Sequence, residues 1–130
     1  MKIIDVVAFF ILLFLALPIN LYAQKVPDEI YKALKTGNSK ELASHFNSNI
    51  YLVILGAEGV YTKTQSTLIL RDFFSKYIPH NYIKMNELGK GTSKCVIGRL
   101  LTSKGNYRVV FIHKEAGPEF IDQFRIEEEN

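Results

Sequence analysis

The polar residues with the most distinctive spacing are Tyr61, Lys63 and Gln65, which alternate just before an apolar helical stretch. A tyrosine hydroxyl and a side-chain amide at one junction could bind a small molecule through hydrogen bonds. The same spacing also suits a helix start, because Thr62 and Gln65 can bond the free backbone groups there. We expect the structural role, and we keep Tyr61 and Gln65 as candidate ligand-binding residues.

Two carboxylates are candidates for the base that an acid–base enzyme needs. Asp122 alternates with Phe120 and Phe124 in a strand-like segment, and this register would point it inward with the two rings. An exposed position at a sheet edge is the competing expectation. Asp72 can pair with Lys76 one helical turn later, on a side of the helix that faces water. We keep Asp122 as a candidate ligand-binding residue and assign no catalytic residue.

The three histidines, His45, His80 and His113, are scattered and lack the paired spacing of a metal site. Of these, His113 alone alternates with apolar residues along a predicted strand, so it could face a pocket. A hydrogen-bonded histidine of the core or its rim is the alternative. We predict no metal and no cofactor, and His113 becomes the fourth candidate ligand-binding residue.

Composition excludes several other functions. The formal net charge of +3 is spread along the chain rather than gathered in a basic stripe, which argues against nucleic-acid binding. The segment GKGTSK at 89–94 imitates a phosphate loop but lacks its full spacing and following helix. The single thiol, Cys95, lies in an apolar run and suits a packed core cysteine.

The first 23 residues have the form of a cleavable secretory signal. Lys2 is followed by an unbroken apolar run at 6–17, which is shorter than the roughly 20 residues that span a bilayer. Ala23 offers a small residue at the cleavage point. We predict a signal peptide at 1–23, a single domain at 24–130, and a periplasmic or secreted location in a bacterial cell envelope. Contact with the membrane would be limited to the uncleaved signal.

Helix signals come early in that domain. Pro27 and the acidic residues after it favour a first helix that ends at Gly37, and Asn38 with Glu41 starts a short second one. We expect Phe46 on the inner face of that second helix. The best-defined helix is predicted at 63–78, with a wide apolar face that includes Leu68, and Pro79 ends it.

Strand signals occupy most of the remainder. An apolar run at 50–55 and a short return at 60–61 predict a hairpin before the long helix. After Pro79 the hydrophobic period changes to two, and turn residues separate segments at 82–88, 94–102, 107–114 and 120–127. We therefore expect an α+β fold of order ααββαββββ, with a curved antiparallel sheet wrapped around the long helix.

This order of elements resembles the nuclear transport factor 2-like superfamily, an α+β cone often with a pocket at its wide mouth. Local strings add a similarity to a family of small exported bacterial proteins known only as a domain of unknown function: ALKTGN at 33–38, GVYTKTQ at 59–65, DFF at 72–74, IG at 97–98, YRV at 107–109 and RIE at 125–127. The resemblance implies fold and export, and no catalytic residue.

The expected function is non-catalytic binding of a small apolar ligand or a protein partner, through the cone pocket or the sheet face. The superfamily also includes isomerases and cyclases, so an enzyme that uses a pocket carboxylate is the first alternative. A structural homodimer is the second.

Overall fold

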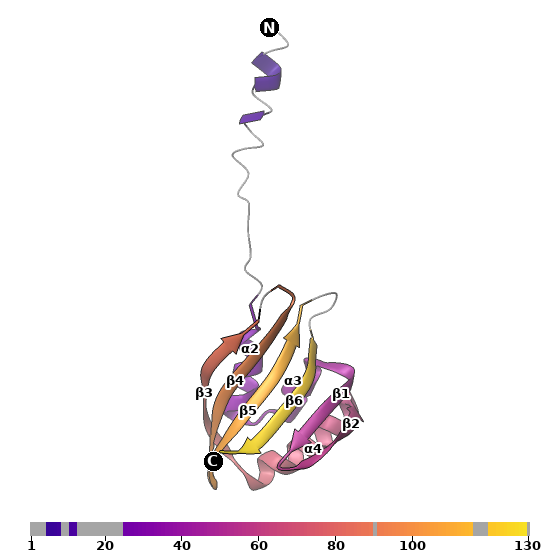
Figure 1. The fold of residues 1–130 in the computed structure, drawn as a ribbon, viewed down its shortest axis with the longest axis vertical. Coiled ribbons are helices and arrows are strands. Elements are labelled where there is room, and N and C mark those ends of the chain that lie inside the picture. Colours follow the sequence, from indigo (N-terminus) through magenta and orange to yellow (C-terminus); the bar gives the residue numbers. More distant parts are fainter. Residues whose placement is uncertain (1–4, 9–10, 13–24, 90, 116–119, 130) are drawn as a thin grey trace.

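A curved sheet of six strands carries helices α2, α3 and α4 on one of its faces in the computed structural model (Figure 1). The structure describes residues 5–8, 11–12, 25–89, 91–115 and 120–129. The helices are α2 Asp28–Thr36, α3 Ser39–Ser44 and α4 Lys63–Lys76. The strands are β1 Phe46–Ile54, β2 Ala57–Thr62, β3 Pro79–Leu88, β4 Ser93–Thr102, β5 Gly105–Lys114 and β6 Phe120–Glu128.

The helix ends follow the expected local chemistry. Gly37 takes the left-handed conformation, with φ of 70°, that ends α2. The Asn38 side chain accepts a hydrogen bond from the Glu41 backbone N–H and starts α3. Thr62 and Gln65 form a complete capping box at the start of α4. Helix α4 ends two residues earlier than predicted, at Lys76.

The sheet is mixed, so the expectation of an antiparallel sheet is wrong in one place. The strand order is β2-β1-β6-β5-β4-β3, and β1 pairs with β6 in parallel. The four strands after α4 do form the predicted antiparallel meander. Between β1 and β6 the chain forms β2, α4 and the strands β3 to β5, and it then places β6 beside β1 in the same direction. The sheet does not close, and β2 and β3 are its edges.

Strand β1 begins four residues earlier than predicted, at Phe46. Phe46 was expected on α3, yet its side chain is 1% exposed and its ring centroid lies 5.6 Å from that of Phe124 on β6. The polar residues 47–49, expected to stop a helix, lie within the strand instead. Asn49 pairs with Thr62 of β2, while the register of β1 against β6 is irregular between Phe46 and Tyr51, so sheet pairing on both sides of this stretch overrides its local preference for a turn.

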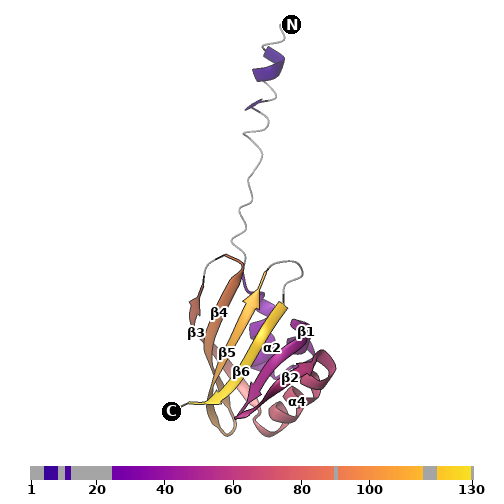
Figure 2. The same cartoon turned by 45° about the vertical axis from the view of Figure 1, so that its right-hand side comes forward.

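The hydrophobic core lies between the inner face of the sheet and the helices, which Figure 2 shows together on one side. Helix α2 contributes Ile30 and Leu34, and α4 contributes Leu70, Phe73 and Phe74; all five are buried. Leu68, expected on the apolar face of α4, is 50% exposed. The buried face of α4 is therefore narrower than its sequence suggests.

The predicted signal peptide at 1–23 falls mostly outside the described residues, and its described parts, 5–8 and 11–12, are helical. No helix among the described residues has both the length and the apolar character needed to cross a membrane.

Candidate functional site

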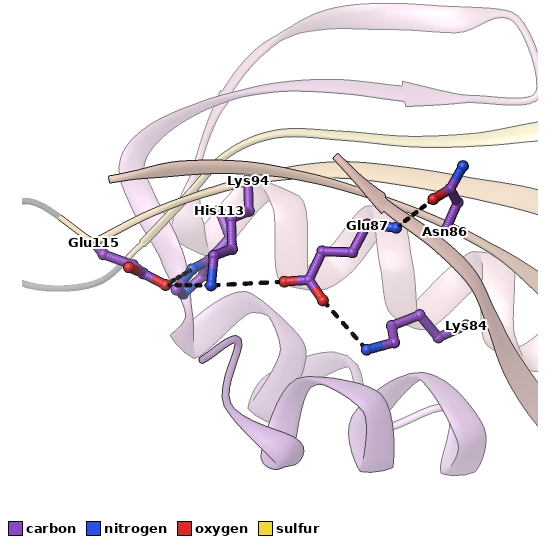
Figure 3. A network of polar contacts seen from close by, with 6 residues as sticks. All are labelled: Lys84, Asn86, Glu87, Lys94, His113 and Glu115. Carbon is purple, nitrogen blue, oxygen red and sulfur yellow. Dashed lines mark hydrogen bonds and ion pairs between the residues drawn. The ribbon is translucent and has the colours of Figure 1, made fainter. Parts of the chain in front are cut away.

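The inner face of the sheet changes from apolar to charged toward one end of β3, β4 and β5. Lys94 lies directly opposite His113, and Glu87 lies opposite a fully buried valine, so these three side chains share the core-facing side. Glu115 follows His113 by two residues. Together with Lys84, these residues form the inner charged cluster (Figure 3).

The contacts within the inner charged cluster are mostly long. Lys84 Nζ donates a hydrogen bond to Glu87 Oε2 at 3.2 Å. Lys94 Nζ lies between two carboxylates, 3.8 Å from Glu87 Oε1 and 3.6 Å from Glu115 Oε1. His113 Nδ1 lies 3.9 Å from Glu115 Oε1. These last three distances suit ion pairs but exceed hydrogen-bond range.

Burial increases along this chain of contacts. The side chain of Lys84 is 47% exposed, that of Lys94 21%, and those of His113 and Glu115 are 1% and 0%. Among the residues that the structure describes, no donor forms a hydrogen bond with either carboxylate oxygen of Glu115. The network thus leads from solvent at Lys84 to a buried carboxylate at Glu115.

Such a cluster adds little to stability. Opposite charges about 4 Å apart attract by about 4 kcal/mol at an effective dielectric constant of about 20. Removing a carboxylate from water costs several kcal/mol unless hydrogen bonds replace its hydration. Because Glu115 lacks such bonds within the described chain, the two effects largely cancel.

Two stacked tyrosines lie next to Lys84, at the solvent end of the inner charged cluster. Tyr31 of α2 and Tyr82 of β3 stack with ring centroids 5.7 Å apart, and Lys84 Nζ lies 5.7 Å from the centre of the Tyr31 ring. Gly98 on β4 makes room for Tyr82, since a Cβ atom there would lie 2.2 Å from the Tyr82 Oη. Both hydroxyl groups are buried, and no described residue forms a hydrogen bond with them.

Burial also perturbs the acidity of both hydroxyls. It raises the pKa of Tyr31 to about 12, with smaller contributions from the negative charges of Glu87 and Asp28. Burial, followed by the neighbouring Tyr31, raises the pKa of Tyr82 as well. Both hydroxyls therefore keep their protons at neutral pH and can donate hydrogen bonds.

A hollow of about 250 Å³ opens next to these residues. It is lined by side chains from the start of α2 and from β3: Lys25, Val26, Asp28, Tyr31, Lys84 and Glu87. Tyr31, Lys84 and Glu87 thus belong both to the hollow and to the polar groups behind it. A small molecule in the hollow would meet the solvent end of the inner charged cluster.

Tyr61 and Gln65, two of the predicted ligand-binding residues, lie away from this cluster at the junction of β2 and α4. The Gln65 side chain accepts a hydrogen bond from the Thr62 N–H at 3.0 Å, which is the expected structural role. Tyr61 is half-buried and packs against the hydrophobic core. These contacts account for both residues, and their binding of a ligand stays a prediction.

The other two predicted residues lie on opposite faces of the sheet. His113 is in the inner charged cluster, whereas Asp122 pairs with Lys114 on the outer face at 3.2 Å. Of the two expected positions of Asp122, the exposed one is observed, and the inward one fails because the register shifts: Ile112 pairs with Gln123, but His113 pairs with Ile121. Asp122 is thus the extra residue of a β-bulge. Asp72 pairs with Lys76 at 3.2 Å, as expected.

Sequence reasoning missed Glu87, Lys94, Glu115, Tyr31 and Tyr82. Glu87 and Lys94 lie in a stretch whose charges are thinly spread over a strand and a turn, and Glu115 falls between a predicted strand and a predicted turn. The one available signal was parity, since His113 and Glu115 are two residues apart and would share a face. No three His, Cys, Asp or Glu side chains in the described ranges are grouped so as to hold a metal ion.

The arrangement of helices on a curved, open sheet defines a class of protein. The structure superimposes on an NTF2-like protein of unknown function from Cytophaga hutchinsonii with a TM-score of 0.56 and 11% sequence identity, over 80% of this chain and 91% of that one. The fold is therefore that of the nuclear transport factor 2-like proteins.

The family is narrower than the fold. Residues 27–127 match the family described as "Domain of unknown function (DUF4783)", and the chain belongs to it. A DUF4783 protein from Bacteroides ovatus is 29% identical, with a TM-score of 0.77 over 83% of this chain and 99% of that one. One from Bacteroides fragilis is 28% identical, with a TM-score of 0.74 over 81% and 100%. No curated protein matches the sequence.

Proposed function

We propose that this protein is an exported, non-catalytic binding domain that holds a small polar ligand between α2 and the charged end of the inner sheet face. The observation that carries the proposal is a set of buried oxygens, those of the Tyr31 and Tyr82 hydroxyls and the Glu115 carboxylate, that form no hydrogen bond with any described residue. Each such atom costs about 1–3 kcal/mol when it stays unbonded. A ligand with matching donors and acceptors would recover that cost.

The interior favours a polar ligand over the apolar one predicted from the sequence. Aromatic rings fill the space beneath the sheet: Phe111 stacks on Phe124 with centroids 6.2 Å apart, and Phe124 meets Phe46 at 5.6 Å. The hollow beside Tyr31 has charged and aromatic walls instead. Binding sites commonly combine an apolar wall with a few convergent polar groups.

The apolar alternative has one site in its favour. A hollow of about 290 Å³ lies between α4 and the β1–β2 turn, with mainly apolar walls that include Ile54, Leu55, Ile69 and Phe73. It contains none of the buried unbonded oxygens. Nothing there would fix the orientation of a ligand, so we prefer the site beside Tyr31.

Export rests on the predicted signal peptide at 1–23. The chain has one cysteine, Cys95, and so cannot form an internal disulfide. Its fold is therefore compatible with an oxidising compartment but does not depend on one. N-terminal sequencing of exported material should begin near Gln24. Material that keeps Met1 in the membrane fraction would contradict export.

Native mass spectrometry of the protein from the cells that make it tests the binding. We expect an adduct that is lost in Tyr31→Phe and Glu115→Gln and kept in the outer-face control Asp122→Asn. Tyr31→Phe removes one oxygen and keeps the ring, so the fold should survive. A bare protein mass, or an adduct that all three variants keep, would contradict the proposal. A ligand that is returned chemically changed would support the isomerase alternative, with Glu115 beside His113 as its carboxylate.

A homodimer is the second candidate function, and edge strand β3 favours it. Ile83, Met85 and Leu88 are 45%, 58% and 50% exposed along this edge. However, Asn81 and Asn86 accept hydrogen bonds from the backbone N–H groups that follow them, at 2.9 and 3.0 Å, which occupies part of the edge. Light scattering at high protein concentration tests the homodimer. A monomer would exclude the dimer and would not affect the proposal of a binding domain.

A further inference from the structure

We infer that the ligand of this site is a small primary amine, and that the side chain of Lys84 competes with the ligand's ammonium group for one position. The inference rests on the proposed function and adds the chemical class of the ligand. It concerns the hollow of about 250 Å³ beside Tyr31. Three observations support it: where the Lys84 ammonium group lies, which carboxylates surround that place, and how weakly Lys84 is held there.

The position for an ammonium group is already occupied by one, that of Lys84. Its Nζ lies 5.7 Å from the centre of the Tyr31 ring and donates a hydrogen bond to Glu87 Oε2 at 3.2 Å. An aromatic face beside a carboxylate is an environment in which proteins bind organic ammonium groups. Tyr82 stacks against Tyr31 with ring centroids 5.7 Å apart and so helps to fix the ring in place. These walls of the hollow therefore suit a cation.

A second carboxylate lies beside the same ring. The negative charges of Glu87 and Asp28 both raise the pKa of Tyr31, so both carboxylates lie near it. The Asp28 carboxylate forms no ion pair or hydrogen bond with another described residue. When Lys84 turns into the solvent, the walls hold these two carboxylates against the ammonium group of Lys25. A ligand with one positive charge restores the balance, whereas a negative charge would widen the difference.

Lys84 is held weakly at this position. Its side chain is 47% exposed, and that of its partner Glu87 is 29% exposed. An ion pair between partly exposed side chains contributes little to stability, and a lysine side chain readily turns its ammonium group into water. The other oxygen of Glu87 stays 3.8 Å from Lys94 Nζ. A ligand ammonium group can thus replace that of Lys84 without disturbing the buried part of the inner charged cluster.

Three probes that share a four-carbon chain test the class by nuclear magnetic resonance on the isotope-labelled protein: butylamine, 1-butanol and butyrate. We expect butylamine to shift the backbone amide signals of Tyr31, Lys84 and Glu87 saturably, and the other two to bind at least about tenfold more weakly. Butylamine should also displace Lys84, so that the side-chain signals of Lys84 lose the ring-current shift from Tyr31. Magnesium chloride supplies an inorganic cation and should not shift these signals.

Two variants separate the competitor from the ligand site. Affinity falls with the fraction of molecules whose site is free, so removing a side chain that fills the site about nine-tenths of the time tightens binding about tenfold. We expect an effect of this size in Lys84→Ala. Adding Glu87→Gln to that variant removes the carboxylate with the competitor already absent, and should weaken binding about tenfold. The control Lys76→Ala, which breaks an ion pair of the same 3.2 Å length on α4, should leave binding unchanged.

The outcomes separate this inference from the proposed function. Unchanged or weaker binding of butylamine in Lys84→Ala would overturn the competition. Equal or tighter binding of 1-butanol, butyrate or magnesium at the same signals would overturn the amine class and keep the binding domain. If no probe shifts these signals, the amine class is overturned, and the native mass spectrum alone decides the proposed function.

Discussion

The inner and outer faces of the sheet use charged residues in opposite ways, although alternating residues of the same strands build both. On the outer face, Arg108 hydrogen-bonds Glu127 at 2.6 Å, and Arg99 Nε bonds Glu129 at 2.8 Å. These side chains are 28–53% exposed. On the inner face, the side chains of His113 and Glu115 are almost fully buried, and His113 Nδ1 lies 3.9 Å from Glu115 Oε1. The short ion pairs thus join partly exposed side chains, and the long ion pair joins buried ones.

This difference indicates different roles. Exposed ion pairs contribute about 0–1 kcal/mol each and keep a sheet face soluble. The hydrogen bond from Arg108 lowers the pKa of Glu127, so that pair has the ordinary behaviour of a surface contact. A buried charged cluster with long contacts brings no comparable gain. The cluster lies beside the hollow at which we propose that a ligand binds.

The two faces should differ most in how much the free energy of unfolding falls when an apolar side chain is shortened. Phe111 is fully buried on the inner face, and its neighbour Val110 is half-buried on the outer face. We expect Phe111→Ala to lower the free energy of unfolding by about 3–5 kcal/mol. Val110→Ala should lower it by about 1 kcal/mol or less. Urea denaturation measures both, and similar losses would mean that another surface covers the outer face.

Replacing ion pairs tests the contrast in charge. The double variant Lys94→Met, Glu115→Leu should raise the free energy of unfolding by about 1–4 kcal/mol, because apolar side chains avoid the desolvation cost. It should also abolish ligand binding. The matched outer-face variant Arg108→Met, Glu127→Leu should change stability by less than about 1 kcal/mol. A marked loss of stability in the inner variant would instead make the cluster structural.

Single hydroxyl deletions sharpen the comparison further. Tyr82→Phe removes an oxygen that no described residue bonds, so in ligand-free protein we expect the free energy of unfolding to rise by up to about 1 kcal/mol. Tyr51→Phe removes the hydroxyl that donates to Glu58 on the outer face and should lower stability slightly. Thermal unfolding of the two variants should shift in opposite directions. A fall for Tyr82→Phe would show that its hydroxyl has a bound partner.

The sequence predicted local structure well because local chemistry produces it. The Thr62 and Gln65 pair starts α4 as expected, and turn residues divide the strands after Pro79 as predicted. The parallel pairing of β1 with β6 was missed, because two strands that are far apart in the chain carry no local mark of their pairing. Phe46 was misassigned for the same reason, since its partner Phe124 lies on β6.

The candidate site was harder to predict than the fold. Its members come from α2, from three neighbouring strands and from the residue that follows β5, and the register of two strand pairings decides which side chains meet. One extra residue in β6 was enough to place Asp122 outside and leave His113 inside. The sequence marks Glu115 only by its spacing of two residues from His113. Its burial becomes apparent only when the pairing of β4 with β5 places Lys94 opposite His113.

The smallest expected effect concerns two tyrosines whose pKa is raised for different reasons. For Tyr31 on the inner side, burial comes first and Glu87 second, and the pKa rises to about 12; for Tyr51 on the outer face, the hydrogen bond to Glu58 comes first. Glu87→Gln should therefore lower the Tyr31 pKa only in part, because burial remains. Glu58→Ala should return the Tyr51 pKa most of the way toward its ordinary value. Because a raised folded-state pKa favours the protonated hydroxyl, the stability linked to Tyr31 is complete below pH 10 and falls as the pH rises from 10 to about 12. Titration of the ring resonances measures both shifts, and a full return of the Tyr31 pKa in Glu87→Gln would show that charge, rather than burial, dominates the inner site.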